Sequence, residues 1–209
     1  MRRILPLVLG AAGISFLVIM LAARKRLTGT TISYEPQSAS GGGYVSTITI
    51  PKQLTVEIVN SARKWAQARD IPLQEVLATI LVESSGNPRE WANKATEDSR
   101  GLMQINVNAW KPLLAQNGMT VDDLWNIDKN IQIGTYIYAR YRKEVQDLIA
   151  QSGTPQSTPI DVLTRLYYKG PAYVRSKILA GQDASHPYKD AEKTVANWQS
   201  AMGKVSTVV

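Results

Sequence analysis

Residues 77–110 read LATILVESSGNPREWANKATEDSRGLMQINVNAW, and this stretch decides the fold. It opens with an apolar run that has the spacing of a helix and ends at Glu83. A polar stretch with the turn signal Gly-Asn-Pro at 86–88 follows. The compact sequence Gly-Leu-Met-Gln, residues 101–104, begins 18 residues after the glutamate. Its glycine permits a close backbone approach, so the pattern predicts a short non-helical segment that returns near the helix end.

The chain from Pro51 onward is predicted to be mostly α-helical. Apolar residues recur at helical spacing over 58–66, 73–81 and 131–148, and shorter helices are expected at 158–168, 172–180 and 188–202. Few stretches alternate between polar and apolar residues as strands do. The predicted fold class is therefore a mostly α domain with a short β or extended segment.

Composition excludes several classes of function. The chain has no cysteine, which rules out a disulfide framework and a thiolate metal site. Its one histidine, His186, cannot form a metal cluster, so neither a metal nor a cofactor is expected. The net charge of +7 is concentrated in residues 1–33, which hold five basic residues and no acidic one. Because the rest of the chain shows no basic stripe, no nucleic-acid partner is expected.

The N-terminus predicts a membrane anchor. Residues 4–23 are 20 consecutive residues without a charge. As a helix they would span roughly 30 Å, which matches the hydrocarbon thickness of a bilayer. Basic residues at 2–3 and 24–26 flank this run on both sides, so charge bias does not orient it. A cleaved signal peptide is the alternative, but the run is longer than a typical signal core.

These features divide the chain into three parts. Residues 1–33 are the anchor with its basic flanks, and 52–209 form the folded domain. Residues 34–51 are rich in Gly and Ser and predict a flexible linker, with a short extended piece at 44–50.

Glu83 has a structural interpretation and a functional one. Most glutamates at helix ends are simply exposed. A carboxyl group on an apolar wall instead loses hydration, so its pKa should rise, as a general acid requires. Gln104 nearby offers a donor and an acceptor to a polar ligand, whereas Met103 by itself is typical of core packing.

The motifs of this chain resemble those of the lytic transglycosylase family with the soluble-lytic-transglycosylase (SLT) fold, over about residues 60–198. The matching positions are Glu83-Ser84, Gly-Leu-Met-Gln at 101–104, Asn130, Ile131 and Gly134 in a helix, Tyr167, Gly170 and Pro171 in a later motif, and Tyr188. The sequence departs from the family pattern at four places. Tyr168 stands where the motif has asparagine, Leu166 replaces alanine, Ile137 replaces a frequent tyrosine, and the proline common after Gly-Leu-Met-Gln is missing near Val107.

The resemblance implies a lysozyme-like α domain that cleaves the β-1,4 bond between N-acetylmuramic acid and N-acetylglucosamine in peptidoglycan. Glu83 would protonate the glycosidic oxygen and then accept the proton of the muramic acid 6-hydroxyl, which leaves a 1,6-anhydro end. The implied substrate-binding residues are Gln104, Met103, Tyr167, Ser84 and Asn130. Ser84 could equally cap or turn the helix end.

Three alternatives remain at this point. Related goose-type lysozymes hydrolyse the same bond, and Glu97 or Asp98 could position a water molecule for that reaction. A non-catalytic peptidoglycan-binding module would retain the cleft without turnover, and the replacement at Tyr168 favours it. A protein that perturbs membranes through residues 1–26 alone is the third.

The expected location is the membrane, with the domain facing the periplasm and cell wall. The expected partners are glycan strands, the membrane through residues 4–23, and an envelope-spanning machine or a virion, including a virion membrane. The sequence does not separate a bacterial from a phage setting.

Overall fold

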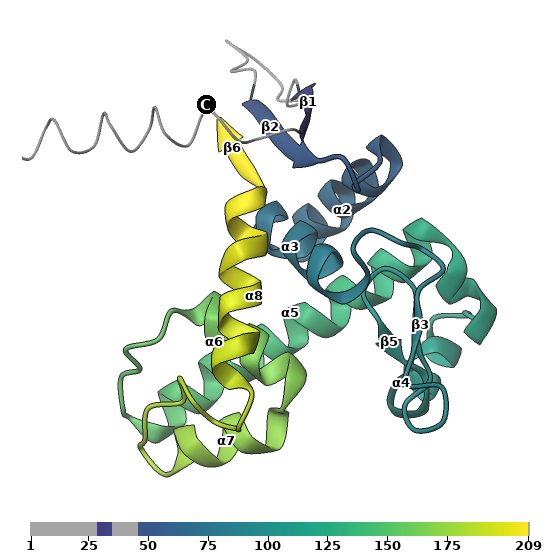
Figure 1. The fold of residues 1–209 in the computed structure, drawn as a ribbon. Helices are drawn as coiled ribbons and strands as arrows, with labels where there is room; N and C mark the ends of the chain where they lie inside the picture. The colour runs from purple at the N-terminus through teal and green to yellow at the C-terminus, as the bar shows by residue number, and fades with distance from the viewer. Residues whose placement is uncertain (1–28, 35–45, 209) are drawn as a thin grey trace, which may run out of the picture.

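The computed structural model describes residues 29–34 and 46–208, and this part of the chain is mostly helical (Figure 1). The anchor predicted at residues 4–23 lies outside the described residues, as does most of the predicted linker. Among the residues described, none of the helices is both long and apolar enough to cross a membrane. The mostly α fold class is confirmed.

The helices fall close to their predicted positions. They are α2 (Val56–Ala68), α3 (Leu73–Ser84), α4 (Val107–Gln116), α5 (Ile127–Ser152), α6 (Ile160–Lys169), α7 (Pro171–Leu179) and α8 (Ala191–Lys204), with the 3₁₀ helix η1 (Val121–Trp125) before α5. Helix α4 was not predicted, and it contains Pro112. It begins because the Asn106 side chain accepts a hydrogen bond from the backbone N–H of Ala109, which caps the first turn.

Two small antiparallel sheets complete the fold. Strands β3 (Trp91–Ala92), β4 (Ser99–Arg100) and β5 (Ile105–Asn106) pair in that order, and they form the short extended segment predicted between Glu83 and α4. The other sheet has the order β1 (Gly29–Tyr34), β2 (Ser46–Pro51) and β6 (Ser206–Val208). Its pairing joins the two ends of the described chain, since β2 lies between β1 and β6.

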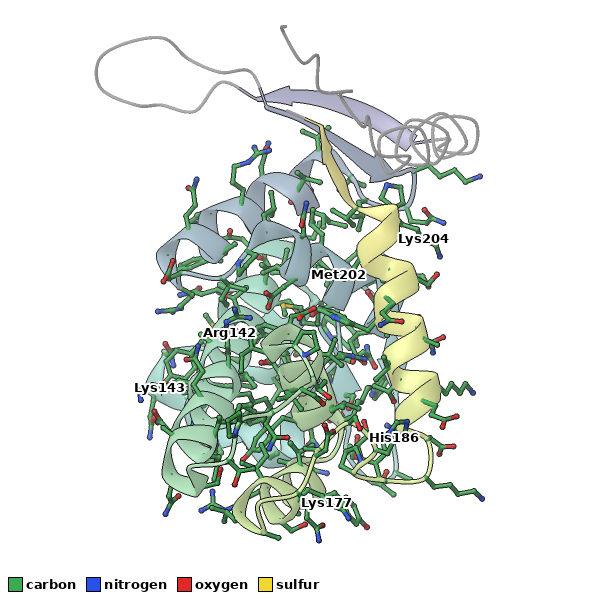
Figure 2. The ribbon with its side chains drawn as sticks, turned by 90° about the vertical axis from the view of Figure 1, so that its left-hand side faces the viewer. Arg142, Lys143, Lys177, His186, Met202 and Lys204 are labelled. Carbon is green, nitrogen blue, oxygen red and sulfur yellow. The ribbon has the colours of Figure 1, made fainter. Side chains whose placement is uncertain are left out.

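Strand β2 lies within the predicted linker. Residues 34–51 were expected to be flexible, with an extended piece at 44–50. The extended piece is present as the strand Ser46–Pro51, which is paired and is followed closely by α2. Figure 2 shows this sheet lying across one end of the helical body, near Met202 and Lys204 at the end of α8.

The core lies around α5, which runs through the middle of the helical body (Figure 1). Helices α2, α6 and α7 pack against α5, and α8 packs against α3 and α6. Large buried side chains fill these interfaces, among them Trp198, Tyr138, Leu77, Ile80 and Ile58. Burying such side chains stabilises the fold by about 1.5–3 kcal/mol each. This core fixes where α3, α5 and α6 meet, and the candidate site lies there.

Candidate active site

The end of α3 is fixed by Ser84 and the residue after it. The Ser84 hydroxyl lies 3.0 Å from the carbonyl oxygen of Ile80 and 2.8 Å from that of Leu102, and it can bond either one. Ser85 then adopts the left-handed conformation, with φ of 52°, which ends the helix. Ser84 is buried and joins α3 to the 101–104 segment. Its role in this structure is therefore to place Glu83 next to that segment, and not to line the groove.

Asn130 of α5 holds the 101–104 segment from the other side. Its Oδ1 accepts a hydrogen bond from the backbone N–H of Met103 at 2.9 Å. Its Nδ2 donates to the carbonyl oxygens of Arg100 and Leu124 at 3.0 and 2.9 Å. Gly101 has φ of 76°, and a Cβ there would collide with the Asn130 amide. Asn130, a predicted substrate-binding residue, is buried and positions the segment, and it is not among the residues that line the groove described below.

Met103 also differs from its expected role. Its side chain is fully buried, and a Cβ at Gly134 of α5 would collide with it. Met103 therefore packs α5 against the segment and does not line a cleft. The backbone still matters, because the carbonyl oxygen of Met103 accepts a hydrogen bond from the Tyr168 hydroxyl at 2.8 Å.

A groove of about 510 Å³ opens beside Glu83. Its walls come from the end of α3, the small sheet β3–β5, and helices α4, α5 and α6. The side chains that line it include Glu83, Glu97, Gln104, Trp110, Tyr141, Tyr168 and Lys169. Three of these are aromatic and lie in a row, with ring centroids 5.9 Å apart for Trp110 and Tyr141 and 5.8 Å apart for Tyr141 and Tyr168. The groove thus combines a carboxylate with an aromatic wall.

Glu83 lies between two cations of α6. Its side chain is only 5% exposed, and Oε1 lies 2.7 Å from Nη1 of Arg165. The guanidinium and the carboxylate thus form a buried ion pair. Nζ of Lys169 donates to Oε2 at 2.9 Å. The two oxygens of one carboxylate therefore face two different positive charges.

These charges overturn the predicted direction of the Glu83 pKa. Burial acts to raise this pKa, as expected from the apolar helix. The positive charges of Arg165 and Lys169 act in the opposite direction, and together they hold the pKa of Glu83 below its usual value. The prediction of a raised pKa was wrong because it considered the α3 wall alone and not the helix packed against it.

The two tyrosines of α6, Tyr167 and Tyr168, have different surroundings. Tyr167, the predicted sugar contact, is buried, and its hydroxyl donates to Oε1 of Glu144 on α5. Arg175 of α7 bonds the same oxygen at 3.0 Å, so Tyr167 ties three helices together and does not line the groove. Tyr168, which replaces the motif asparagine, lines the groove beside Glu83.

Gln104, a predicted substrate-binding residue, lines the groove. Its Nε2 donates to the backbone carbonyl oxygens of Glu90 and Gly101, at 3.0 and 2.9 Å. The amide nitrogen is thus committed to the backbone, which orients the side chain. The amide oxygen is the atom that Gln104 can offer to a ligand in the groove.

The two acidic residues of the lysozyme alternative have different surroundings. Asp98 bonds Arg100 twice, at 2.8 and 2.9 Å, and accepts a bond from Trp91. The bond to Arg100 is the main reason that the pKa of Asp98 is lowered. Glu97 lines the groove, and its Oε2 accepts bonds from Asn93 and Ser99. Only Glu97 of the pair therefore lines the groove with Glu83.

Sequence reasoning missed the contributions of Arg165 and Lys169. A signal was present, because residues four apart on a helix share one face, and the two cations belong to the same helix as the motif tyrosine. The spacing predicts that Arg165 and Lys169 lie on the same face of α6, but it does not predict that this face meets Glu83. Among the described residues, no group of three or more His, Cys, Asp or Glu side chains is placed to hold a metal ion.

Comparisons with known proteins bear on the family and the fold of this chain. The family model described as Transglycosylase SLT domain matches residues 60–162, which include Glu83, Gln104 and Asn130. Among solved structures, the fold is similar to that of lytic transglycosylase Slt from Pseudomonas aeruginosa, in an inactive glutamate-to-glutamine mutant. The TM-score is 0.51 at 14% sequence identity, and the match covers 68% of this chain but only 23% of the other. No curated protein sequence matches this chain.

Proposed function

We propose, from the match of the Transglycosylase SLT domain model to residues 60–162, that this chain is a peptidoglycan lytic transglycosylase with Glu83 as its catalytic acid and base. The observation that carries the proposal is the position of Glu83. It is a buried carboxylate at the wall of a groove that is also lined by Gln104 and by the aromatic row of Trp110, Tyr141 and Tyr168. The inactive glutamate-to-glutamine mutant of the similar Pseudomonas protein supports a glutamate acid in this fold.

In the proposed reaction Glu83 acts twice. As the carboxylic acid it gives its proton to the oxygen of the β-1,4 bond between N-acetylmuramic acid and N-acetylglucosamine, and that bond breaks. As the carboxylate it then takes the proton of the muramic acid 6-hydroxyl, whose oxygen bonds to the anomeric carbon. The product carries a 1,6-anhydro end and no water is consumed. A second catalytic carboxylate is therefore unnecessary, in contrast to most glycosidases.

The groove supplies contacts for the sugars on either side of that bond. The rings of Trp110, Tyr141 and Tyr168 offer apolar faces with polar edges, which suit sugar rings. The amide oxygen of Gln104 can accept a hydrogen bond from a hydroxyl or acetamido N–H. These four residues form the proposed binding set, in place of Met103, Tyr167, Ser84 and Asn130.

The test is mass spectrometry of the fragments that the full-length chain, kept in detergent, releases from purified sacculi. Anhydro-muropeptides are expected with the wild type. Glu83→Gln should lower the rate by about 10²–10⁴-fold, the usual contribution of acid–base catalysis. Glu192→Gln, which alters an exposed carboxylate on α8, should leave the rate unchanged.

Glu83→Gln also leaves Arg165 without its counter-charge. Because removing one partner of a buried ion pair typically destabilises by about 3–5 kcal/mol, that variant could lose activity by unfolding. Glu83→Asp keeps the charge and shortens the side chain by one methylene. It should remain folded by circular dichroism, and its release of fragments should still drop strongly. A folded Glu83→Asp or Glu83→Gln variant with wild-type release would refute Glu83 as the acid.

Hydrolysis as in a goose-type lysozyme is the second candidate, and the position of Glu97 in the groove favours it. It predicts fragments with reducing ends instead of anhydro ends. It also predicts that Glu97→Gln abolishes release while leaving the fold intact. Binding to sacculi without any release would instead indicate a wall-binding module.

We also propose that residues 4–23 anchor the protein in a membrane with the domain facing the cell wall. The support is the uncharged run and its basic flanks. Peptidoglycan lies outside the cytoplasmic membrane, so the proposed substrate sets the orientation. Local opening of the wall would serve a secretion or conjugation machine, or a phage particle during entry.

A further inference from the structure

Lys169 and Arg165 contact the same carboxylate but differ in exposure. Both lie on α6, one helical turn apart, and each approaches a different oxygen of Glu83. The Arg165 side chain is 1% exposed and is enclosed by neighbours that include the rings of Tyr168 and Trp198. The Lys169 side chain is 42% exposed and lies in the wall of the groove. The arginine is thus a fixed part of the core, whereas the lysine is at the surface.

The lysine occupies the oxygen that the reaction needs. Oε1 of Glu83 faces the buried Arg165 and is itself without solvent contact. Oε2 is therefore the oxygen that can meet a glycosidic oxygen in the groove. In this structure Nζ of Lys169 donates a hydrogen bond to Oε2 at 2.9 Å. A glycosidic oxygen and the ammonium group cannot take the same position on Oε2.

We propose that Lys169 is a displaceable cap on Glu83, and that an entering glycan strand must move its ammonium group off Oε2 before the carboxyl group can act. This inference rests on the proposed function. The flexible four-carbon stem and the exposure of Lys169 allow the movement, which the buried Arg165 cannot make. Lys169 is a positioning residue in this scheme, because it acts through Glu83 and not on the bond that breaks.

The cap has a consequence for the dependence on pH. The titratable side chains of the groove are Glu83, Glu97, Tyr141, Tyr168 and Lys169, with Arg165 behind Glu83. Burial raises the pKa of both tyrosines, so they stay neutral while Glu83 titrates. Only Arg165 and Lys169 lower the pKa of Glu83, against the effect of burial. Removing the Lys169 charge should therefore increase the protonated fraction of Glu83 at any given pH.

A purely structural role for Lys169 makes a different prediction. A cation in the last turn of a helix is favourable because it meets the negative end of the helix dipole. If that were its whole role, replacing Lys169 would lower the melting temperature slightly and would leave the pH profile of the reaction in place. The pH profile therefore separates the two roles.

The experiment measures kcat/KM against pH for the full-length chain acting on purified glycan strands, with Lys169→Met, Lys169→Arg and Lys177→Met. Lys169→Met should move the alkaline limb of the profile to higher pH and raise kcat/KM near neutral pH about three- to tenfold, a reduced effect because the lysine is partly exposed. Lys169→Arg retains the charge and should retain the wild-type limb. Lys177→Met removes a charge of α7 that does not line the groove and lies at the opposite end of the molecule from Lys204 (Figure 2), so it controls for general attraction of the substrate.

A second readout does not depend on turnover. Carbon-13 NMR titration of the Glu83 carboxyl group should give a higher pKa in Lys169→Met than in the wild type. An unchanged carboxyl titration would overturn the cap even if the enzyme is active, and so would an unchanged or uniformly reduced pH profile. The proposed function fails by a separate result, in which wild type and Glu83→Gln release equally little from sacculi. In that case the NMR titration still decides whether Lys169 controls Glu83.

Discussion

Tyr168 is the residue at which this chain departs most visibly from the family motif. In the structure it makes contacts that an asparagine could not make. Its hydroxyl reaches the carbonyl oxygen of Met103, and its ring packs against those of Tyr138 and Tyr141. It therefore connects α6 to both α5 and the Gly-Leu-Met-Gln segment. An asparagine at 168 would be too short to fill this space.

Restoring the motif residue should therefore harm the protein. Tyr168→Asn removes a ring from an aromatic cluster and a hydrogen bond to Met103, which should lower the free energy of unfolding by about 2–4 kcal/mol. Release of fragments from sacculi should fall as well. The measurement is urea unfolding together with the sacculus assay. A stable Tyr168→Asn variant with higher activity would mean that the motif asparagine is still needed.

The charge of Glu83 should also appear in the stability of the fold against pH. Arg165 and Lys169 lower its pKa below the usual 4.5, against the effect of burial. A lowered pKa in the folded state stabilises above the usual pKa, and this contribution is lost as pH falls through the folded value. The wild type should therefore lose more unfolding free energy than Glu83→Gln between pH of about 7 and about 3. Parallel losses in chemical unfolding of the two proteins would contradict the ion pair.

At the scale of elements, the geometry of the site depends on the hydrogen bonds that hold the 101–104 segment between α3 and α5. From α3, the Ser84 hydroxyl bonds the carbonyl oxygen of Leu102. From α5, the Asn130 side chain accepts a bond from the Met103 N–H and donates to the carbonyl oxygens of Arg100 and Leu124. Gly134 leaves room for Met103 at the same junction. The motif residues Ser84, Asn130 and Gly134 thus mainly hold the segment in place next to Glu83.

Replacing Asn130 should loosen this junction. Asn130→Asp keeps the shape but sets a carboxylate oxygen against the carbonyl oxygens of Arg100 and Leu124, so we expect a loss of about 3 kcal/mol in unfolding free energy. Asn126→Asp makes the same chemical change at the N-cap of α5, where aspartate caps as well as asparagine. That control should change stability by less than about 0.5 kcal/mol. Equal stability of the two variants would show that the Asn130 bonds are unimportant.

At the scale of the whole molecule, the sheet β1-β2-β6 brings the beginning and end of the described chain together, at the end of the helical body away from α7 (Figure 1). Strand β1 starts at Gly29, three residues after the basic cluster 24–26. If residues 4–23 are an anchor, this short spacing ties the sheet close to the membrane surface. The groove is built from residues 83–171 and belongs to the helical body.

Deleting residues 1–26 tests the anchor while leaving β1 in the chain. The full chain should sediment with membranes and resist a carbonate wash, because a spanning helix is held by the hydrocarbon core. The shortened chain should stay in the supernatant and still cleave sacculi, since the groove is intact. Membrane association without residues 1–26 would refute the anchor. A mature N-terminus near residue 24 would identify a cleaved signal peptide instead.

The local pattern predicted much of the fold. Helices α2, α3, α5, α6, α7 and α8 were visible because apolar spacing is a property of neighbouring residues. Helix α4 was not predicted. It contains Pro112, which argues against a helix, and it begins at the cap that the Asn106 side chain provides. The sheet with β1 and β6 could not be found, since pairing of distant strands depends on the packed chain.

The candidate site also has some features that the sequence predicts and others that only the packed chain determines. The sequence by itself determined that Glu83 ends an apolar helix, that Gly-Leu-Met-Gln returns beside it, and that the chain resembles the SLT family. Only the tertiary structure decided that Lys169, 86 residues away in the chain, caps Glu83, and that Tyr168 rather than Tyr167 lines the groove. Helical spacing tells which residues share a face, but not which helix that face meets. The pKa of Glu83 was missed for this reason, because a pKa depends on distances to charges that only packing sets.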